Sequence, residues 1–171
     1  MFVKATIASI FIIIYGFIET DSRFEFTNVN CTSFEKRIVE FEYCYLKSIN
    51  RSYKYLSGKL KLNEIPLSNM KRFNGYKPFL YNITVDVCKF LAKPKSSPVA
   101  KFVYDTYVDY SNVNHSCPFN NDLYLEKLPV DFVNHRLTKI LPFPEGDYLF
   151  EFIGIRDRSV IGNGKVYCTV S

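Results

Sequence analysis

The chain has no tryptophan, only two histidines and none of the short motifs that mark common catalytic and metal sites. His115 and His135 are not spaced as metal ligands, and no Cys-x-x-Cys pair accompanies them. A Gly-x-Ser-x-Gly turn, a paired Cys/His signature and a glycine-rich phosphate loop are also missing from the sequence. We therefore expect no metal, no cofactor and no enzymatic activity.

Long apolar runs and basic runs are scarce as well. The one long apolar stretch, Ile7–Phe17, is shorter than the roughly 20 residues that a membrane-spanning helix needs. We expect residues 1–20 to be a signal peptide, with an uncleaved anchor as the alternative, and the remainder to be soluble. The net charge of +5 is mild and comes without a basic run, so we expect no nucleic-acid partner and at most transient contact with a membrane.

The chain does have four Asn-x-Ser/Thr sequons, spaced along its length. A sequon carries a glycan only in a chain that enters the secretory pathway. Four sequons behind an apolar N-terminus predict a secreted, extracellular glycoprotein. The candidate glycosylation sites are Asn30, Asn50, Asn82 and Asn114.

Apolar and polar residues alternate over several short segments, which is the pattern of β-strands with one buried face. Between Tyr81 and Val87 the odd positions are apolar and the even ones polar, so the sequon at Asn82 falls on the polar side. We interpret Ile161–Gly164 as part of the turn that joins the last two strands. The other alternating groups are Phe24 and Phe26; Val39, Phe41, Tyr43 and Tyr45; Leu56, Leu60 and Leu62; Leu123 and Leu125; Tyr148, Phe150 and Phe152; and Val166, Cys168 and Val170.

One segment has helical spacing instead. Ser97 is a good N-cap residue and Pro98 suits the first helical position. The apolar and aromatic positions that follow with helical periodicity are Val99, Phe102, Val103, Tyr107 and Tyr110. The sequence thus predicts a mainly β chain: a two-sheet antiparallel sandwich of immunoglobulin-like architecture with one short helix at about residues 98–110, forming a single domain over residues 21–171. We expect Leu128–Asp147 to be irregular.

Five cysteines are present, and in an oxidising compartment they are expected to form disulfides. The preferred pair is Cys88 with Cys117, which would hold together the two ends of the helical segment. Cys31 with Cys44 is the second choice and leaves Cys168 free, whereas Cys31 with Cys168 is the rival pairing.

Five stretches carry a resemblance to a known family: Phe41–Ser48, Asn50–Leu56, Arg72–Asn82, Asn114–Pro118 and Leu141–Tyr148. Together they resemble a large family of secreted insect proteins with a domain of unknown function. That family looks like a distant branch of the ML-type lipid-recognition superfamily. The resemblance implies a β-sandwich that holds an apolar ligand between its sheets, and by analogy a chemosensory role.

Two functions follow as hypotheses. The first is a secreted carrier of a lipid or other small apolar molecule, with a cell-surface receptor as a further partner. The second is an extracellular module that recognises another protein through the sandwich surface or through Leu128–Asp147. For the carrier, the expected ligand-binding residues are the inward-facing side chains of the predicted strands and helix: Val39, Phe41, Tyr43, Tyr45, Phe79, Tyr81, Ile83, Val85, Phe102, Val103, Phe150 and Phe152.

Overall fold

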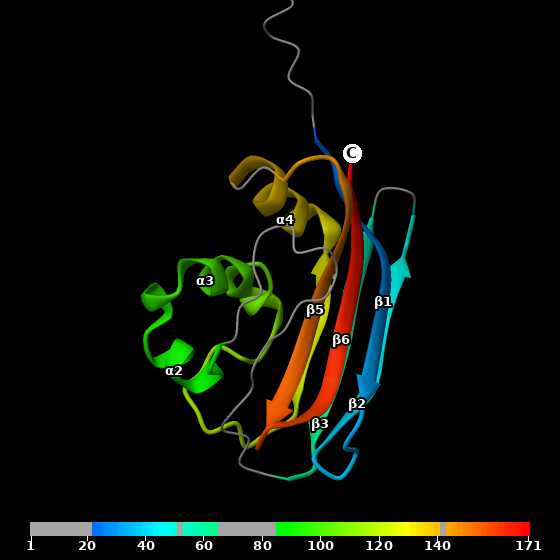
Figure 1. The fold of residues 1–171 in the computed structure, drawn as a ribbon. Helices are drawn as coiled ribbons and strands as arrows, with labels where there is room; N and C mark the ends of the chain where they lie inside the picture. The colour runs from blue at the N-terminus through cyan, green and yellow to red at the C-terminus, as the bar shows by residue number, and fades with distance from the viewer. Residues whose placement is uncertain (1–21, 51–52, 65–84, 141–142) are drawn as a thin grey trace, which may run out of the picture.

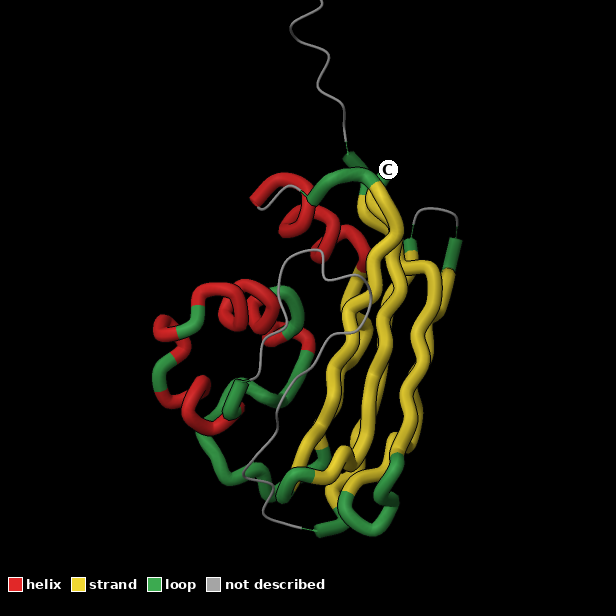
Figure 2. Tube along the Cα trace, in the orientation of Figure 1, coloured by secondary structure: helices red, strands yellow, loops and turns green. Residues whose placement is uncertain are grey.

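The computed structural model describes residues 22–50, 53–64, 85–140 and 143–171. Within these residues six strands form two antiparallel sheets of three strands each, stacked as two layers (Figures 1 and 2). The expected mainly β, two-sheet sandwich is therefore confirmed. The predicted strand residues Phe79, Tyr81 and Ile83 lie outside the described residues, as does the sequon at Asn82.

The first sheet has the strand order β1-β6-β5 and the second has the order β2-β3-β4. In the first sheet, β6 pairs with both neighbours along nearly its whole length. The strands of the first sheet are β1 (Phe24–Ser33), β5 (Gly146–Arg156) and β6 (Ser159–Val170). The strands of the second sheet are β2 (Val39–Ser48), β3 (Lys54–Leu62) and β4 (Leu123–Pro129).

The two sheets are joined along one edge, where β1 lies close to β2. Cys31 of β1 and Cys44 of β2 form a disulfide there, with their Cα atoms 6.1 Å apart. Because β1 and β2 are the end strands of their sheets, β5 and β4 form the opposite edge of the sandwich. Below, the inner face of a sheet is the side toward the other sheet, and the outer face is the opposite side.

The helical segment lies beside the β4–β5 edge (Figure 1). A second disulfide, between Cys88 and Cys117, closes this segment as predicted. Ser111, at its end, forms an isolated antiparallel bridge with Leu125 of β4. The elements of the segment are α2 (Val87–Ala92), the 3₁₀ turn η1 (Pro94–Ser96), α3 (Pro98–Asp105) and the 3₁₀ turn η2 (Val108–Tyr110).

The prediction of a single helix was incomplete. The helix expected at residues 98–110 ends at Asp105, and only a short 3₁₀ turn follows it. The expected end of the strand at Val85–Val87 instead leads into α2, because the Asp86 carboxylate accepts a hydrogen bond from the Lys89 backbone N–H (3.1 Å) and caps that helix. Val85 lies just before this cap and not on a strand.

Leu128–Asp147 is not irregular as expected, because it contains α4 (Val130–His135) and the π-helical turn η3 (Arg136–Ile140). Val130, Val133 and Leu137 are buried, at the i, i+3 and i+7 spacing of one helical face. They cover the end of the sandwich between β1 and β4 (Figure 1). None of the helices in the described ranges is long and apolar enough to cross a membrane.

The interior consists of two separate apolar clusters. The larger one lies at the α4 end and joins Phe24 and Phe26 of β1 to Leu56 and Leu128 of the second sheet. The smaller one lies toward the opposite end, beside α2. It is formed by Val39, Leu62, Phe119 and Ile161.

A bulge in β2 changes which side chains face the interior. Phe41 pairs with Leu60 and Tyr43 pairs with Lys59, so Glu42 is an extra residue on β2. An extra residue moves every later side chain to the opposite face. Val39 and Phe41 therefore face inward as predicted, but Tyr43 and Tyr45 face outward, and their assignment to the inner face was wrong.

The turn between β5 and β6 also differs from the prediction. Ile161–Gly164 lies within β6, where residues 162–164 pair with both β1 and β5. The turn is instead the two-residue connection Asp157–Arg158, and both residues have positive φ (50° and 71°). Two-residue hairpin turns need this backbone conformation, which asparagine and glycine usually supply. The turn was predicted at residues 162–164 because glycine and asparagine occur there and not at the true turn.

Candidate functional site

A row of aromatic side chains on the inner face of β5 is the best candidate for a ligand-binding surface. Tyr148, Phe150 and Phe152 alternate along the strand, and all three are partly buried. Tyr148 and Phe150 contact the larger core cluster. The ring of Phe143 lies 5.4 Å from that of Tyr148 and 6.2 Å from that of Phe150, measured between centroids. The row is thus directed toward the interior without being enclosed by it.

The helical segment extends this aromatic surface. Phe102 of α3 packs against the larger cluster, and so do Tyr107 and Tyr110 from the residues that follow α3. The Tyr110 ring lies 5.1 Å from the ring of Phe132 of α4 in an edge-to-face arrangement. Such edge-to-face pairs contribute about 0.5–1.5 kcal/mol beyond the apolar area that they bury. Val103 of α3 is also partly buried.

Between the two core clusters the central strands of both sheets carry glycines, and a disulfide lies at the β1–β2 edge. Cys31 pairs with Gly164 of β6, and Gly164 pairs in turn with Phe152 of β5. In the other sheet Cys44 pairs with Gly58 of β3. The Cys31–Cys44 bridge therefore occupies the row of the sandwich that separates the clusters, and Phe152 lies in that same row.

The predicted site residues divide into three groups. Phe102, Phe150 and Phe152 border the inner aromatic surface, whereas Val39 and Phe41 belong to the far end of the sandwich, where they pack over Gly162. Tyr43 and Tyr45 are on the outer face, and Tyr45 is 41 % exposed. The structure thus brings only part of the predicted set together.

Five residues at this surface were missing from the predicted ligand-binding set: Tyr107, Tyr110, Leu125, Phe143 and Tyr148, the last although it alternates with Phe150 and Phe152. Tyr107 and Tyr110 could also have been identified from the sequence, because they follow the helical spacing of α3. Leu125 alternates with polar neighbours in β4. Phe143 lies in the loop before β5, where no periodicity indicates which way a side chain points.

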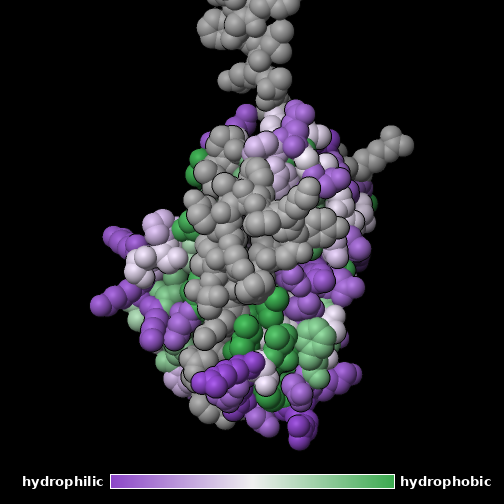
Figure 3. All heavy atoms as spheres, in the orientation of Figure 1, coloured by the Kyte–Doolittle hydropathy of each residue, from purple (hydrophilic) through white to green (hydrophobic). Residues whose placement is uncertain are grey.

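The apolar character of β5 continues to the surface. Figure 3 shows hydrophobic side chains gathered over the lower ends of β5 and β6, with hydrophilic side chains below and beside them. Val160 of β6 is 43 % exposed. An apolar molecule reaching this edge of the sandwich would therefore meet apolar surface before it reached the interior.

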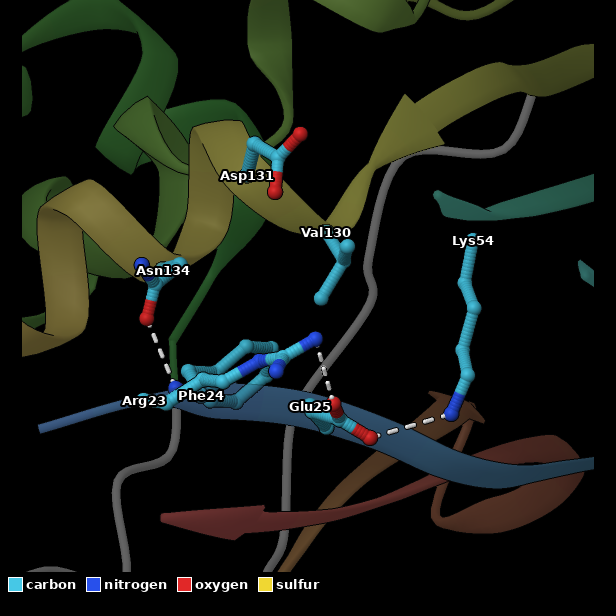
Figure 4. Close-up of a pocket in the computed structure, with 7 residues that line it drawn as sticks. All are labelled: Arg23, Phe24, Glu25, Lys54, Val130, Asp131 and Asn134. Atoms are coloured by element: carbon cyan, nitrogen blue, oxygen red, sulfur yellow. Dashed lines mark hydrogen bonds and ion pairs between the residues drawn. The ribbon is translucent and has the colours of Figure 1, made fainter. Parts of the chain in front are cut away.

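A small pocket at the α4 end is unsuited to a ligand (Figure 4). Its volume of about 20 Å³ holds little more than one water molecule. Asn134 of α4 accepts a hydrogen bond there from the Phe24 backbone N–H (2.6 Å). Glu25 bridges Arg23 (2.8 Å) and Lys54 (3.1 Å) at the rim. These contacts are structural, since they tie α4 and β3 to the start of β1.

Cys168 is the free cysteine, and it pairs with Tyr148 at the α4 end of the aromatic row. The residue is 2 % exposed, and its thiol donates a weak hydrogen bond to the Tyr148 carbonyl oxygen (3.7 Å). Burial raises the pKa of this thiol to about 12, with a smaller contribution from Asp147. The rival pairing with Cys31 is wrong, because Cys31 is bonded to Cys44.

Three of the four sequon asparagines lie within the described residues, and all three are exposed. Asn30 is on the outer face of β1, Asn50 is in the β2–β3 connection and Asn114 is in the loop before Cys117. Each position leaves room for a glycan in solvent.

The comparisons with known proteins place the chain in a family. The family described as "Protein of unknown function (DUF1091)" matches residues 65–150, which include α2, α3, β4, α4 and the first part of β5. No curated protein and no solved structure matches the chain significantly. Since the family match spans half of the chain, the protein is a member of the DUF1091 family.

Proposed function

We propose that the protein is a secreted binding protein for a lipid or other small apolar molecule, which it holds against the inner aromatic row of β5 and the aromatic side chains of the helical segment. One observation carries this proposal: Tyr148, Phe150 and Phe152 point into the sandwich but stay only partly buried. The protein acts by binding and release rather than by catalysis.

The energetics favour an apolar occupant. Each Å² of apolar surface removed from water contributes about 25 cal/mol, so a ligand that covers this row replaces packing that the interior lacks. Specific sites for small molecules are mostly apolar, with a few polar groups that fix the orientation. The Tyr148 hydroxyl, which donates a hydrogen bond to the Pro144 carbonyl (2.6 Å), is one such group at the end of the row.

Secretion is part of the proposal and rests on separate observations. Two disulfides in one small domain are typical of proteins in oxidising compartments. The exposed sequon asparagines support the same conclusion. The sequence motifs that resemble the ML-type superfamily support an apolar ligand and, by analogy, a chemosensory role.

The test is saturable binding of a fluorescent fatty-acid probe and of a fluorescent sterol probe to delipidated, secreted protein. We expect at least one probe to bind and to be displaced by its unlabelled parent lipid. Native mass spectrometry of protein taken directly from the culture medium is expected to show a bound lipid. Absence of saturable binding for both probes, together with no co-purifying lipid, would rule out the carrier function.

Two variants locate the binding surface. Phe152→Ala is expected to lower probe affinity about tenfold, because it removes an aromatic side chain from the row. Phe34→Ala is the matched control: Phe34 is 54 % exposed at a loop outside the sandwich, so its loss is expected to leave affinity unchanged. The melting temperature of each variant shows whether the fold is retained. Equal effects of the two substitutions would place the ligand elsewhere.

Recognition of another protein through Leu128–Asp147 is less well supported. Exposed aromatic side chains in that segment would favour this function. Its two aromatic residues, Phe132 and Phe143, are partly buried against the larger core cluster. The segment thus contributes to the sandwich interior more than to a recognition surface.

A further inference from the structure

The outer face of the β2-β3-β4 sheet carries an open groove that the proposed function does not use. Its volume is about 820 Å³, within the range of small-molecule sites. Its floor is a row across three strands: Tyr43 of β2 pairs with Lys59 of β3, and Lys59 pairs with Tyr124 of β4. Two strand spacings separate the tyrosines, roughly 10 Å at the backbone.

Both tyrosines are accessible from solvent. Tyr124 is 42 % exposed, and Tyr43 is partly buried beside the exposed Tyr45, with a centroid distance of 5.7 Å. Burial raises the pKa of Tyr43 above its ordinary value, and the nearby Glu126 carboxylate raises it further. The phenol therefore stays protonated and keeps both a donor and an acceptor on the edge of an apolar ring.

The polar walls are built from amide and carboxylate side chains. Asn120 and Asn121 are exposed along one side, in the loop that the Cys88–Cys117 disulfide anchors. Asn112 fixes this loop to β4, since its amide donates to the Asp122 carbonyl (2.8 Å) and its oxygen accepts from the Tyr124 backbone N–H (2.9 Å). The groove is thus largely formed before any ligand arrives, which lowers the entropic cost of binding.

The charges in the groove argue against an ionic ligand. The Lys59 ammonium is held between the Glu42 carboxylate (2.8 Å) and the Asp122 carboxylate (3.5 Å). With Glu126, three carboxylates surround one ammonium, so an anion such as a phosphate or a sulfated sugar is repelled. A cation would have to compete with the Lys59 ammonium, which already occupies Glu42 and Asp122. A neutral molecule avoids both costs.

We propose that this groove binds a neutral oligosaccharide. One face of a pyranose ring consists mainly of C–H bonds and stacks on an aromatic ring, while its hydroxyls exchange hydrogen bonds with amides and carboxylates. Tyr43 and Tyr124 supply two stacking platforms along the row, at a separation that a short saccharide spans. Asn120, Asn121 and Glu126 supply donors and acceptors beside them.

The test is a titration of the isotope-labelled, full-length secreted chain with cellohexaose, chitohexaose and maltohexaose, followed by backbone amide NMR shifts. We expect saturable shifts with at least one of them, centred on Glu42, Tyr43, Lys59 and Tyr124. The saccharides are added up to about 10 mM, above the millimolar Kd that corresponds to about −4 kcal/mol. The absence of saturable shifts with all three overturns the proposal.

Substitutions in the groove and probe molecules that carry a charge complete the test. Tyr124→Ala and Tyr43→Ala are each expected to weaken binding about tenfold. Tyr167→Ala is the control, because Tyr167 is on β6 in the other sheet and its loss is expected to leave binding unchanged. Preference for a heparin hexasaccharide, for spermine or for a protein captured on this face would contradict a neutral-sugar site. Because the fatty-acid and sterol probes report on the interior, failure of one proposal does not imply failure of the other.

Discussion

Cys31 of β1 and Cys44 of β2 form the covalent bond between the two sheets of the sandwich, with their Cα atoms 6.1 Å apart. The bond requires both side chains to point inward. On β2 this is possible because the bulge at Glu42 places Cys44, rather than Tyr43, on the inner face. One extra residue in a strand thus allows the disulfide and also creates the tyrosine-bearing outer face.

Removing this bridge is expected to loosen the two layers. The double substitution Cys31→Ala/Cys44→Ala should lower the free energy of unfolding by about 3 kcal/mol, since the bond closes a short loop in the unfolded chain. Denaturant unfolding of variant and wild type measures the difference. Cys88→Ala/Cys117→Ala, which opens the longer loop, is the comparison and should cost about 3–4 kcal/mol. A Cys31/Cys44 variant as stable as wild type would show that the bridge contributes nothing to the sandwich.

Gly162 of β6 is expected to tolerate no side chain. A Cβ atom there would lie 3.0 Å from the Thr32 carbonyl oxygen, a backbone atom that cannot move alone. Gly162→Ala should therefore destabilise the protein by about 1–3 kcal/mol. In the matched control, Gly58→Ala, the nearest atom to the new Cβ is 3.7 Å away, which is an ordinary contact. Thermal unfolding of both variants checks the contrast, and similar losses in the two would contradict it.

The Cys168 thiol is expected to be inert in the folded chain. A thiol reagent such as DTNB at about pH 8 should leave native protein unmodified and should label one thiol per chain after unfolding, because the thiol is buried and its pKa is raised. Rapid labelling of the native protein would contradict this placement.

The same thiol predicts a pH dependence of stability. Its pKa rises from 9.0 to about 12 on folding, so the stability it contributes is complete below about pH 9 and is lost as the pH rises toward 12. Between about pH 8 and about pH 10.5 wild type should lose about 2 kcal/mol relative to Cys168→Ala. Urea unfolding of both proteins at the two pH values measures the difference. Parallel curves would show that Cys168 is not the cause.

The β5–β6 turn offers a substitution that should stabilise the protein. Arg158 has a φ of 71°, which costs a side-chain-bearing residue energy that glycine avoids. Arg158→Gly is expected to raise the free energy of unfolding by about 0.5–1 kcal/mol. Ser159→Gly, one position later and within β6, should instead lower it by a similar amount. Chemical denaturation distinguishes the two, and a loss of stability in both would contradict the turn assignment.

Much of the architecture could be predicted from the sequence. Alternating residues indicated all six described strands, and the spacing from Val99 onward indicated α3. Both disulfides were among the predicted pairings. These features depend on neighbours in sequence or on a small number of cysteine combinations, so local patterns are enough to find them.

The candidate site was only partly predictable. Phe102, Phe150 and Phe152 were identified because a regular alternation or helical spacing persists through them. Tyr43 and Tyr45 were placed on the wrong face because the bulge at Glu42 has no signature in the residues around it. The outer groove was not predicted at all, since Tyr43, Lys59 and Tyr124 come from three strands that only the sheet pairing brings together.

The sequence by itself determined which segments become strands, which face of most strands is apolar and which cysteines can meet. Those properties follow from the period of the chain and from the chemistry of each residue. Only the tertiary structure decided where the alternation shifts, which aromatic side chains stay partly open to solvent and which ones line the outer groove. The physical reason is that a bulge and a cross-strand row depend on pairing partners far apart in the chain, whose positions no local pattern records.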